Sequence, residues 1–189
     1  IKEAGDYHKA GQFEQAAFLY ENLLGAVPND AVLLFLYGTL CSQVQRFGSA
    51  ITFLKRSVEL APELNEAWHN LGVALRNEGH GEEARQAYGR AISLDPDNPD
   101  LMAMMAGSFI NEGEPEKALA WAEKALAIDP DQIHGINHKA LALLELGRFS
   151  EAWEPYRARF ALPNLSASPR PYDCPEWDGR PVKKLAIHG

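Results

Sequence analysis

A period of 34 residues runs through most of the sequence without an insertion, and it constrains the fold more than any other feature. Small residues recur at two phases of this period, and proline recurs at a third. The three series are Ala16, Ala50, Ala84, Ala118 and Ala152; Ala4, Gly38, Gly72, Ala106 and Ala140; and Pro28, Pro62, Pro96 and Pro130. A fixed period of this length indicates an array of similar structural units, and small side chains mark places where two elements pack closely.

Each unit is predicted to be a pair of helices. Apolar residues fall at helical spacing, first at Trp68, Leu71, Gly72 and Leu75 and then at Ala84, Ala87, Tyr88 and Ala91. The recurring proline ends the second helix and starts the turn that follows. Within the pairs, "RFG" at 46–48, "EGHG" at 78–81 and "EGEP" at 112–115 predict turns in which glycine supplies a left-handed cap. One pair cannot bury its own apolar face, so neighbouring pairs must stack.

The pattern "W-x-x-L-G-x-x-L", continued by the recurring Ala, Tyr, Ala and Pro, resembles the tetratricopeptide repeat family over residues 1 to about 166. The resemblance implies an all-α fold, a right-handed α-solenoid of five antiparallel helix pairs with an irregular C-terminal extension. We place the repeats at 1–30, 31–64, 65–98, 99–132 and 133–166. The last repeat is degenerate, because Arg159 stands where a small residue is expected and Asn164 where proline is expected.

Composition excludes several classes of function. The net charge of −8 argues against binding to nucleic acid, which needs a basic face. The longest apolar run, 31–37, is far shorter than the roughly 18 residues of a membrane span, so we expect no membrane segment. Two cysteines make neither a disulfide framework nor a metal-ligand pattern, which favours a reducing compartment such as the cytoplasm. No phosphate loop or nucleophile-and-base arrangement occurs, so we predict no catalytic residue and no cofactor in this segment.

The family resemblance implies that the first helices line a concave wall that binds a protein or an extended peptide. We predict that ten side chains contact this partner: Phe35, Thr39, His69, Asn70, Val73, Arg76, Ala103, Ile110, Asn137 and Leu141. An apolar residue at these positions could equally pack against the adjacent helix.

Two specialised binding modes of the family can be compared with these positions. The carboxylate clamp of chaperone-binding arrays is absent, because its positions carry Phe35, Thr39, Asp100 and Met104. The asparagine ladder of O-linked N-acetylglucosamine transferases survives only at Asn70.

Two other local patterns are weaker. His134 and His138 lie four residues apart, as in a two-histidine metal site, but no third ligand is evident and we predict no metal. The acidic run 95–100 lacks the glycine and glutamate of a calcium loop, so its acids are expected to cap the helix that follows.

Residues 167–189 form a proline-rich linker with a short run of strand character, "KKLAIH", near its end. From Arg157 onward the chain carries a net charge of +3, whereas the preceding part carries −11. One interpretation is a surface extension of the array. The other rests on "EAWEPYRARF" and "PEWDG", which resemble the junction in bacterial proteins where a tetratricopeptide array continues into a glycosyltransferase-like domain related to heptosyltransferases and O-linked N-acetylglucosamine transferases.

Three functions follow from these observations. The chain could be a scaffold that binds a protein or peptide and has no activity itself. It could instead recruit an acceptor for a glycosyltransferase domain that lies beyond Gly189. A third hypothesis is self-association through the ends of the array, because stacked repeats present apolar faces at both ends.

Overall fold

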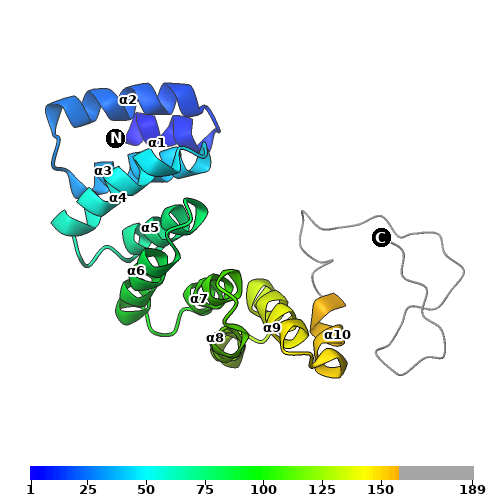
Figure 1. Cartoon of the computed structure of the whole chain (residues 1–189). Helices are drawn as coiled ribbons and strands as arrows, with labels where there is room; N and C mark the ends of the chain where they lie inside the picture. The colour runs from blue at the N-terminus through cyan, green and yellow to red at the C-terminus, as the bar shows by residue number, and fades with distance from the viewer. Residues whose placement is uncertain (158–189) are drawn as a thin grey trace, which may run out of the picture. The chain divides into compact units, whose positions relative to one another are not determined.

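The structure is a computed structural model that describes residues 1–157. In this part of the chain ten α-helices follow one another as five pairs (Figure 1). The first helices are α1 (Lys2–Lys9), α3 (Ala31–Gln43), α5 (Asn65–Asn77), α7 (Pro99–Asn111) and α9 (Ile133–Glu145). The second helices are α2 (Phe13–Ala26), α4 (Phe47–Leu60), α6 (Gly81–Leu94), α8 (Pro115–Ile128) and α10 (Phe149–Arg157). The predicted all-α class, built from stacked helix pairs, is confirmed.

The chain divides into two compact units, of which the first comprises Ile1–Asp97 and the second begins at Asn98. Helices α1–α6 belong to the first unit and α7–α10 to the second. The two unusual residues of the last repeat, Arg159 and Asn164, and the linker 167–189 lie outside the described residues.

The recurring small residues mark the closest approaches between helices. Ala16, Ala50, Ala84, Ala118 and Ala152 are all completely buried. At two positions of the second series the packing leaves no room for a Cβ: one added at Gly72 would lie 2.5 Å from Cε1 of Tyr88. At Gly38, an added Cβ would lie 2.7 Å from Cγ of Leu54. These two contacts join the helices within pairs α5–α6 and α3–α4.

The turns within the pairs agree with the sequence prediction at two places and differ at one. Gly79 and Gly113 adopt left-handed conformations, with φ of 88° and 71°. The predicted cap in "RFG" is wrong, because Gly48 belongs to α4 and Gln45 adopts φ of 60° instead. The left-handed residues keep the 34-residue period, so the turn geometry persists where the sequence lacks glycine. Backbone hydrogen bonds explain this: Arg46 N donates to Cys41 O and His80 N to Leu75 O, both at 2.8 Å.

Polar side chains cap three of the first helices. Asp30 accepts a hydrogen bond from the backbone of Leu33 at 2.9 Å. In the acidic run 95–100, Asn98 rather than an acid caps the helix, because its Oδ1 accepts from the backbone N–H of Asp100 at 3.1 Å. The prediction that the acids cap α7 is therefore wrong. Gln132 caps α9, and Asp100 accepts a hydrogen bond from its Nε2 at 2.8 Å.

Candidate functional site

Helices α3 and α5 bring two of the predicted residues into direct contact. Nδ2 of Asn70 donates to Oγ1 of Thr39 at 2.8 Å, and that hydroxyl donates in turn to the backbone carbonyl of Phe35 at 2.8 Å. The three residues are partly exposed. The hydrogen bonds therefore fix the orientation of Asn70 and Thr39 on a surface that a partner can reach.

The other predicted residues of the first unit lie along α5. His69, Val73 and Arg76 are partly exposed. The ring of His69 approaches the ring of Tyr88 with centroids 6.4 Å apart. Burial raises the pKa of Tyr88 to about 12, and the positive charge of Arg76 opposes this increase. We call the six predicted residues of α3 and α5 the first-helix surface of unit 1.

The predicted residues of the second unit lie on α7 and α9. Ala103 is completely buried in a cluster with Met102 and Ala125. Ala103 therefore packs between helices and offers no surface to a partner, which is the alternative that the sequence left open for apolar positions. Ile110 packs against a second buried cluster and is only partly exposed, as is Leu141. Asn137 is also partly exposed on α9.

The two histidines of α9 stack their rings with centroids 6.4 Å apart. An added Cβ at Gly107 would lie 2.8 Å from Cε1 of His138, so glycine on α7 makes room for this ring. Within residues 1–157 no three histidine, cysteine or acidic side chains gather closely enough to hold a metal ion. In the same part of the chain, every helix is too short or too polar to cross a lipid bilayer.

Comparison with known proteins decides the family. The model of the family described as "Tetratricopeptide repeat" matches residues 7–74 and 75–140. The chain belongs to the tetratricopeptide repeat family. Solved structures agree with this fold. A crystal structure of MamA is 26% identical in sequence and matches with a TM-score of 0.76. The match covers 84% of this chain and 92% of the MamA chain.

Two curated relatives are longer proteins that match this chain over only part of their length. "Protein FlbA" of Caulobacter vibrioides is 31% identical over 168 residues, which are 87% of this chain and 23% of FlbA. "Hsp70-Hsp90 organizing protein" of Triticum aestivum is 30% identical over 97 residues, which are 51% of this chain and 17% of that protein. The chain thus spans less than a quarter of the length of these relatives.

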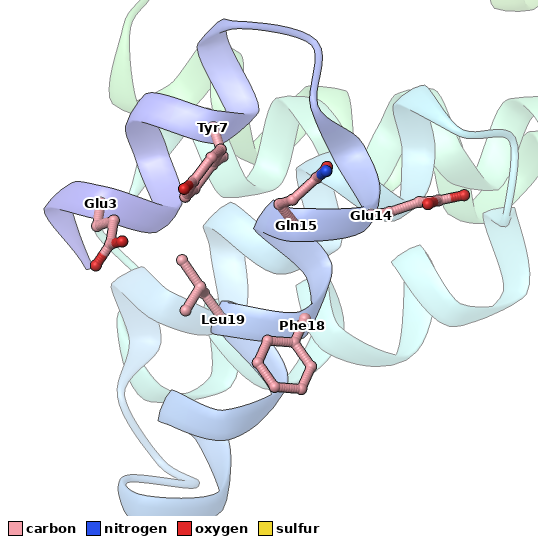
Figure 2. A pocket seen from close by; sticks show the side chains of 6 residues that line it. All are labelled: Glu3, Tyr7, Glu14, Gln15, Phe18 and Leu19. Atoms are coloured by element: carbon pink, nitrogen blue, oxygen red, sulfur yellow. The ribbon is translucent and has the colours of Figure 1, made fainter.

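The tetratricopeptide array also has a groove between α1 and α2 that the sequence prediction missed. Its volume is about 370 Å³, and it is lined by Glu3, Tyr7, Glu14, Gln15, Phe18 and Leu19. Tyr7 and Leu19 lie between the two helices, with Glu3 towards one end and Glu14 towards the other (Figure 2). Phe18 is 65% exposed. We call this the N-terminal groove.

A second groove, of about 560 Å³, lies among α4, α5 and α6. Its apolar lining includes Val58, Trp68 and Leu71. Nζ of Lys55 lies 2.7 Å from Oε2 of Glu83, and this hydrogen bond lowers the pKa of Glu83. Both partners are about half exposed, so the ion pair contributes little to stability. We call this the α4–α6 groove; its residues differ from the ten that the sequence predicted.

Proposed function

We propose that this chain is a protein-interaction scaffold that binds an extended segment of a partner protein along its first helices. Family membership supports the general role, and the wheat relative, the "Hsp70-Hsp90 organizing protein", is consistent with it. The more specific location rests on the first-helix surface of unit 1.

The observation that supports this location is the hydrogen bond between Asn70 and Thr39, which joins neighbouring first helices. Packed helix axes are about 8–10 Å apart, and an extended peptide rises about 3.1–3.4 Å per residue. About three peptide residues therefore span the distance from α3 to α5. A bound peptide would meet Phe35 on one helix and the polar side chains of α5 on the next.

Charge suggests which peptide fits. Arg76 is the one residue with a permanent charge among the ten that the sequence predicts for binding. Near the surface of a protein a cation within about 4 Å of a carboxylate gains several kcal/mol of Coulomb energy before desolvation. The preferred peptide therefore carries an acidic residue near Arg76 and an apolar residue near Phe35.

The test is to select peptides from a displayed random library on the 189-residue chain and to titrate a fluorescent copy by anisotropy. The variant Arg76→Glu with His69→Ala alters the first-helix surface. The matched control, Arg90→Glu with Gln86→Ala, makes the same changes of charge and size on exposed residues of the α4–α6 groove.

We expect the first-helix variant to weaken binding at least about tenfold, the equivalent of about 1.4 kcal/mol, and the control to change it less than about twofold. Circular dichroism must show that both variants keep their helices. A loss confined to the control would place the peptide in the α4–α6 groove and contradict the proposal.

A second proposal is that the array recruits the acceptor for a glycosyltransferase domain in a longer polypeptide. The motifs "EAWEPYRARF" at 151–160 and "PEWDG" at 175–179 support it, and of these residues only 151–157 are described by the structure. Blotting source cells with an antibody to this chain measures the native length. A polypeptide larger by a whole domain is expected, whereas a band near 20.9 kDa would contradict the proposal.

A further inference from the structure

The N-terminal groove has nearly the same lining positions as the α4–α6 groove, two repeats further along unit 1. Adding two periods of 34 residues to five of its six lining positions gives lining residues of that groove: Leu71, Leu75, Glu83, Gln86 and Ala87. In the α4–α6 groove a third helix, α4 of the preceding pair, supplies Lys55, Val58 and Glu59. The N-terminal groove is lined by α1 and α2 alone. A helix therefore fits its open side, as α4 fits the later groove.

Two contacts between neighbouring pairs show which residues meet when a second helix covers the next first helix. The hydroxyl of Tyr37 on α3 donates a hydrogen bond to the carboxylate of Glu21 on α2. Nζ of Lys139 on α9 lies 3.3 Å from Oε1 of Glu123 on α8. Tyr37 and Lys139 share one phase of the 34-residue period, the covered phase, and Glu21 and Glu123 share another, the covering phase. Polar residues at these two phases therefore contact each other.

The N-terminal groove carries an acidic residue at the covered phase, because Glu3 lies one period before Tyr37. On α4 the covering phase is Lys55, whose Nζ lies 2.7 Å from Oε2 of Glu83, in the groove that the apolar Leu71 also lines. A basic residue at the covering phase of an incoming helix would therefore meet Glu3.

The lining of the N-terminal groove includes two negative charges and no positive one. Glu3 and Glu14 are exposed, and within residues 1–157 neither carboxylate makes a hydrogen bond or an ion pair. The two acids lie towards opposite ends of the groove, with Tyr7 and Leu19 between the helices (Figure 2). An occupant with basic residues towards both ends and apolar residues between them complements this arrangement.

Phe18 gives the groove an apolar contact point. Its side chain is 65% exposed. The equivalent residues of the next three second helices are Thr52, Gln86 and Ala120, which are small or polar and exposed. Phe18 is the one large apolar side chain in this set. Burying an exposed phenylalanine against a partner removes apolar surface from water and favours association.

We propose that the N-terminal groove binds an amphipathic helix of a partner protein, with a lysine or arginine beside Glu3, a second basic residue towards Glu14 and an apolar side chain on Phe18. Recognition of a helix in a groove uses apolar contacts along one face of the helix, and the charges set its orientation. The site lies on α1 and α2, whereas the first-helix surface of unit 1 lies on α3 and α5. The proposal therefore does not depend on peptide binding at that surface.

The probe is a 14-residue peptide with the sequence of α4, which occupies the equivalent place in the α4–α6 groove. It carries Lys55 at the covering phase, and the replacement Glu59→Lys removes its one acidic residue. The labelled 189-residue chain is titrated with this α4 peptide to about 1 mM and followed by amide nuclear magnetic resonance. We expect the largest shifts on α1 and α2, around Tyr7 and Leu19. An absence of shifts at about 1 mM, or shifts concentrated on other helices, overturns the proposal.

Variants of the chain identify the contacts. Glu3→Lys should weaken binding of the α4 peptide by about three- to tenfold, and Phe18→Ser by at least about tenfold. The matched controls are Glu63→Lys, at an exposed position between α4 and α5, and Phe149→Ser, whose side chain is 58% exposed on α10. Both controls should bind within about twofold of the unaltered chain. Circular dichroism must show that all four variants keep their helices, and unchanged binding by Glu3→Lys or Phe18→Ser overturns the proposal.

A charge reversal separates this contact from a general attraction between a basic peptide and an acidic chain. The α4 peptide with Lys55→Glu should bind the Glu3→Lys chain at least about threefold more tightly than the unaltered chain. The same peptide should gain less than about twofold on Glu63→Lys. An equal gain on the two chains would show that only net charge matters and overturns the pairing.

A second copy of this chain is the competing occupant, and light scattering of the chain alone tests for it. We expect the 20.9 kDa of one chain up to about 1 mM. A mass of two chains that returns to one chain in Phe18→Ser would assign the groove to a second copy and overturn the proposal.

Discussion

Gly72→Ala tests whether close helix contact, rather than flexibility, explains the recurring glycine. The added Cβ would lie 2.5 Å from Cε1 and 2.6 Å from Cδ1 of Tyr88. Tyr88 is completely buried, and its ring is rigid, so it cannot swing aside as a flexible side chain could. Gly89 provides the matched control, because it lies within α6 of the same pair and an added Cβ there meets nothing within 4 Å.

Two effects of opposite sign act on the free energy of unfolding of Gly72→Ala. Overpacking a core costs about 1–3 kcal/mol, and two contacts with a rigid ring favour the upper end of that range. Alanine returns about 1 kcal/mol through its better helix propensity. Gly72→Ala should therefore lower the free energy of unfolding by about 2 kcal/mol, whereas Gly89→Ala should raise it by about 0.5–1 kcal/mol.

Urea denaturation followed by circular dichroism measures both changes, with the midpoint and the slope fitted separately. For a chain of this length, a loss of 2 kcal/mol lowers the melting temperature by about 4–8 °C. In a Tyr88→Leu background the cost of Gly72→Ala should shrink, because leucine can adjust where the ring cannot. Equal effects of the two alanine substitutions in the unaltered chain would refute the reasoning.

Three further predictions concern single groups. Gln45→Gly should raise the free energy of unfolding by about 1 kcal/mol in urea melts, because Gln45 has a φ of 60° that glycine adopts without strain; a destabilised variant would contradict this. Tyr88→Phe should leave stability at neutral pH unchanged or raise it by up to about 1 kcal/mol, because the buried hydroxyl has no hydrogen-bond partner among the described residues. Burial raises the pKa of Tyr88 from 10.0 to about 12, so between about pH 10 and 12 the unfolded chain loses this proton while the folded chain keeps it. Over that range the free energy of unfolding of the unaltered chain should fall by about 1.4 kcal/mol per pH unit relative to Tyr88→Phe. Parallel pH profiles of the two proteins would contradict the shift. Asn70→Ala should cost about 0.5–1.5 kcal/mol in the unaltered chain and less in a Thr39→Val background, as a double-mutant cycle measures; equal costs in both backgrounds would show that the hydrogen bond contributes nothing.

The 34-residue period was sufficient to predict the helix pairs, because buried alanines and glycines recur wherever two helices touch. It could not predict Gln45 as a left-handed residue, since the turn geometry comes from backbone hydrogen bonds and persists without glycine. It also placed Ala103 on the binding surface, whereas packing of α7 buries it. The sequence does not indicate whether a small apolar side chain at such a position is buried between helices or exposed on the binding surface.

The N-terminal groove was missed for a different reason. The predicted binding residues all lie on first helices, whereas the signal for this groove lies at an exposed position of the second helices. Phe18 stands out there against Thr52, Gln86 and Ala120. The ion pair between Lys139 of α9 and Glu123 of α8, by contrast, follows only from side-chain distances. Periodicity shows which residues are equivalent, but not which of them touch.

The central claim is that a partner peptide binds along the first helices, and amide nuclear magnetic resonance of the labelled chain tests it most directly. A library-selected peptide is titrated into the chain, and the perturbed amides are mapped onto the helices. The account predicts that the largest shifts fall on α3 and α5, around Thr39, Asn70 and Arg76. Shifts concentrated instead on α4 and α6 would contradict it, because the peptide would then occupy the second helices.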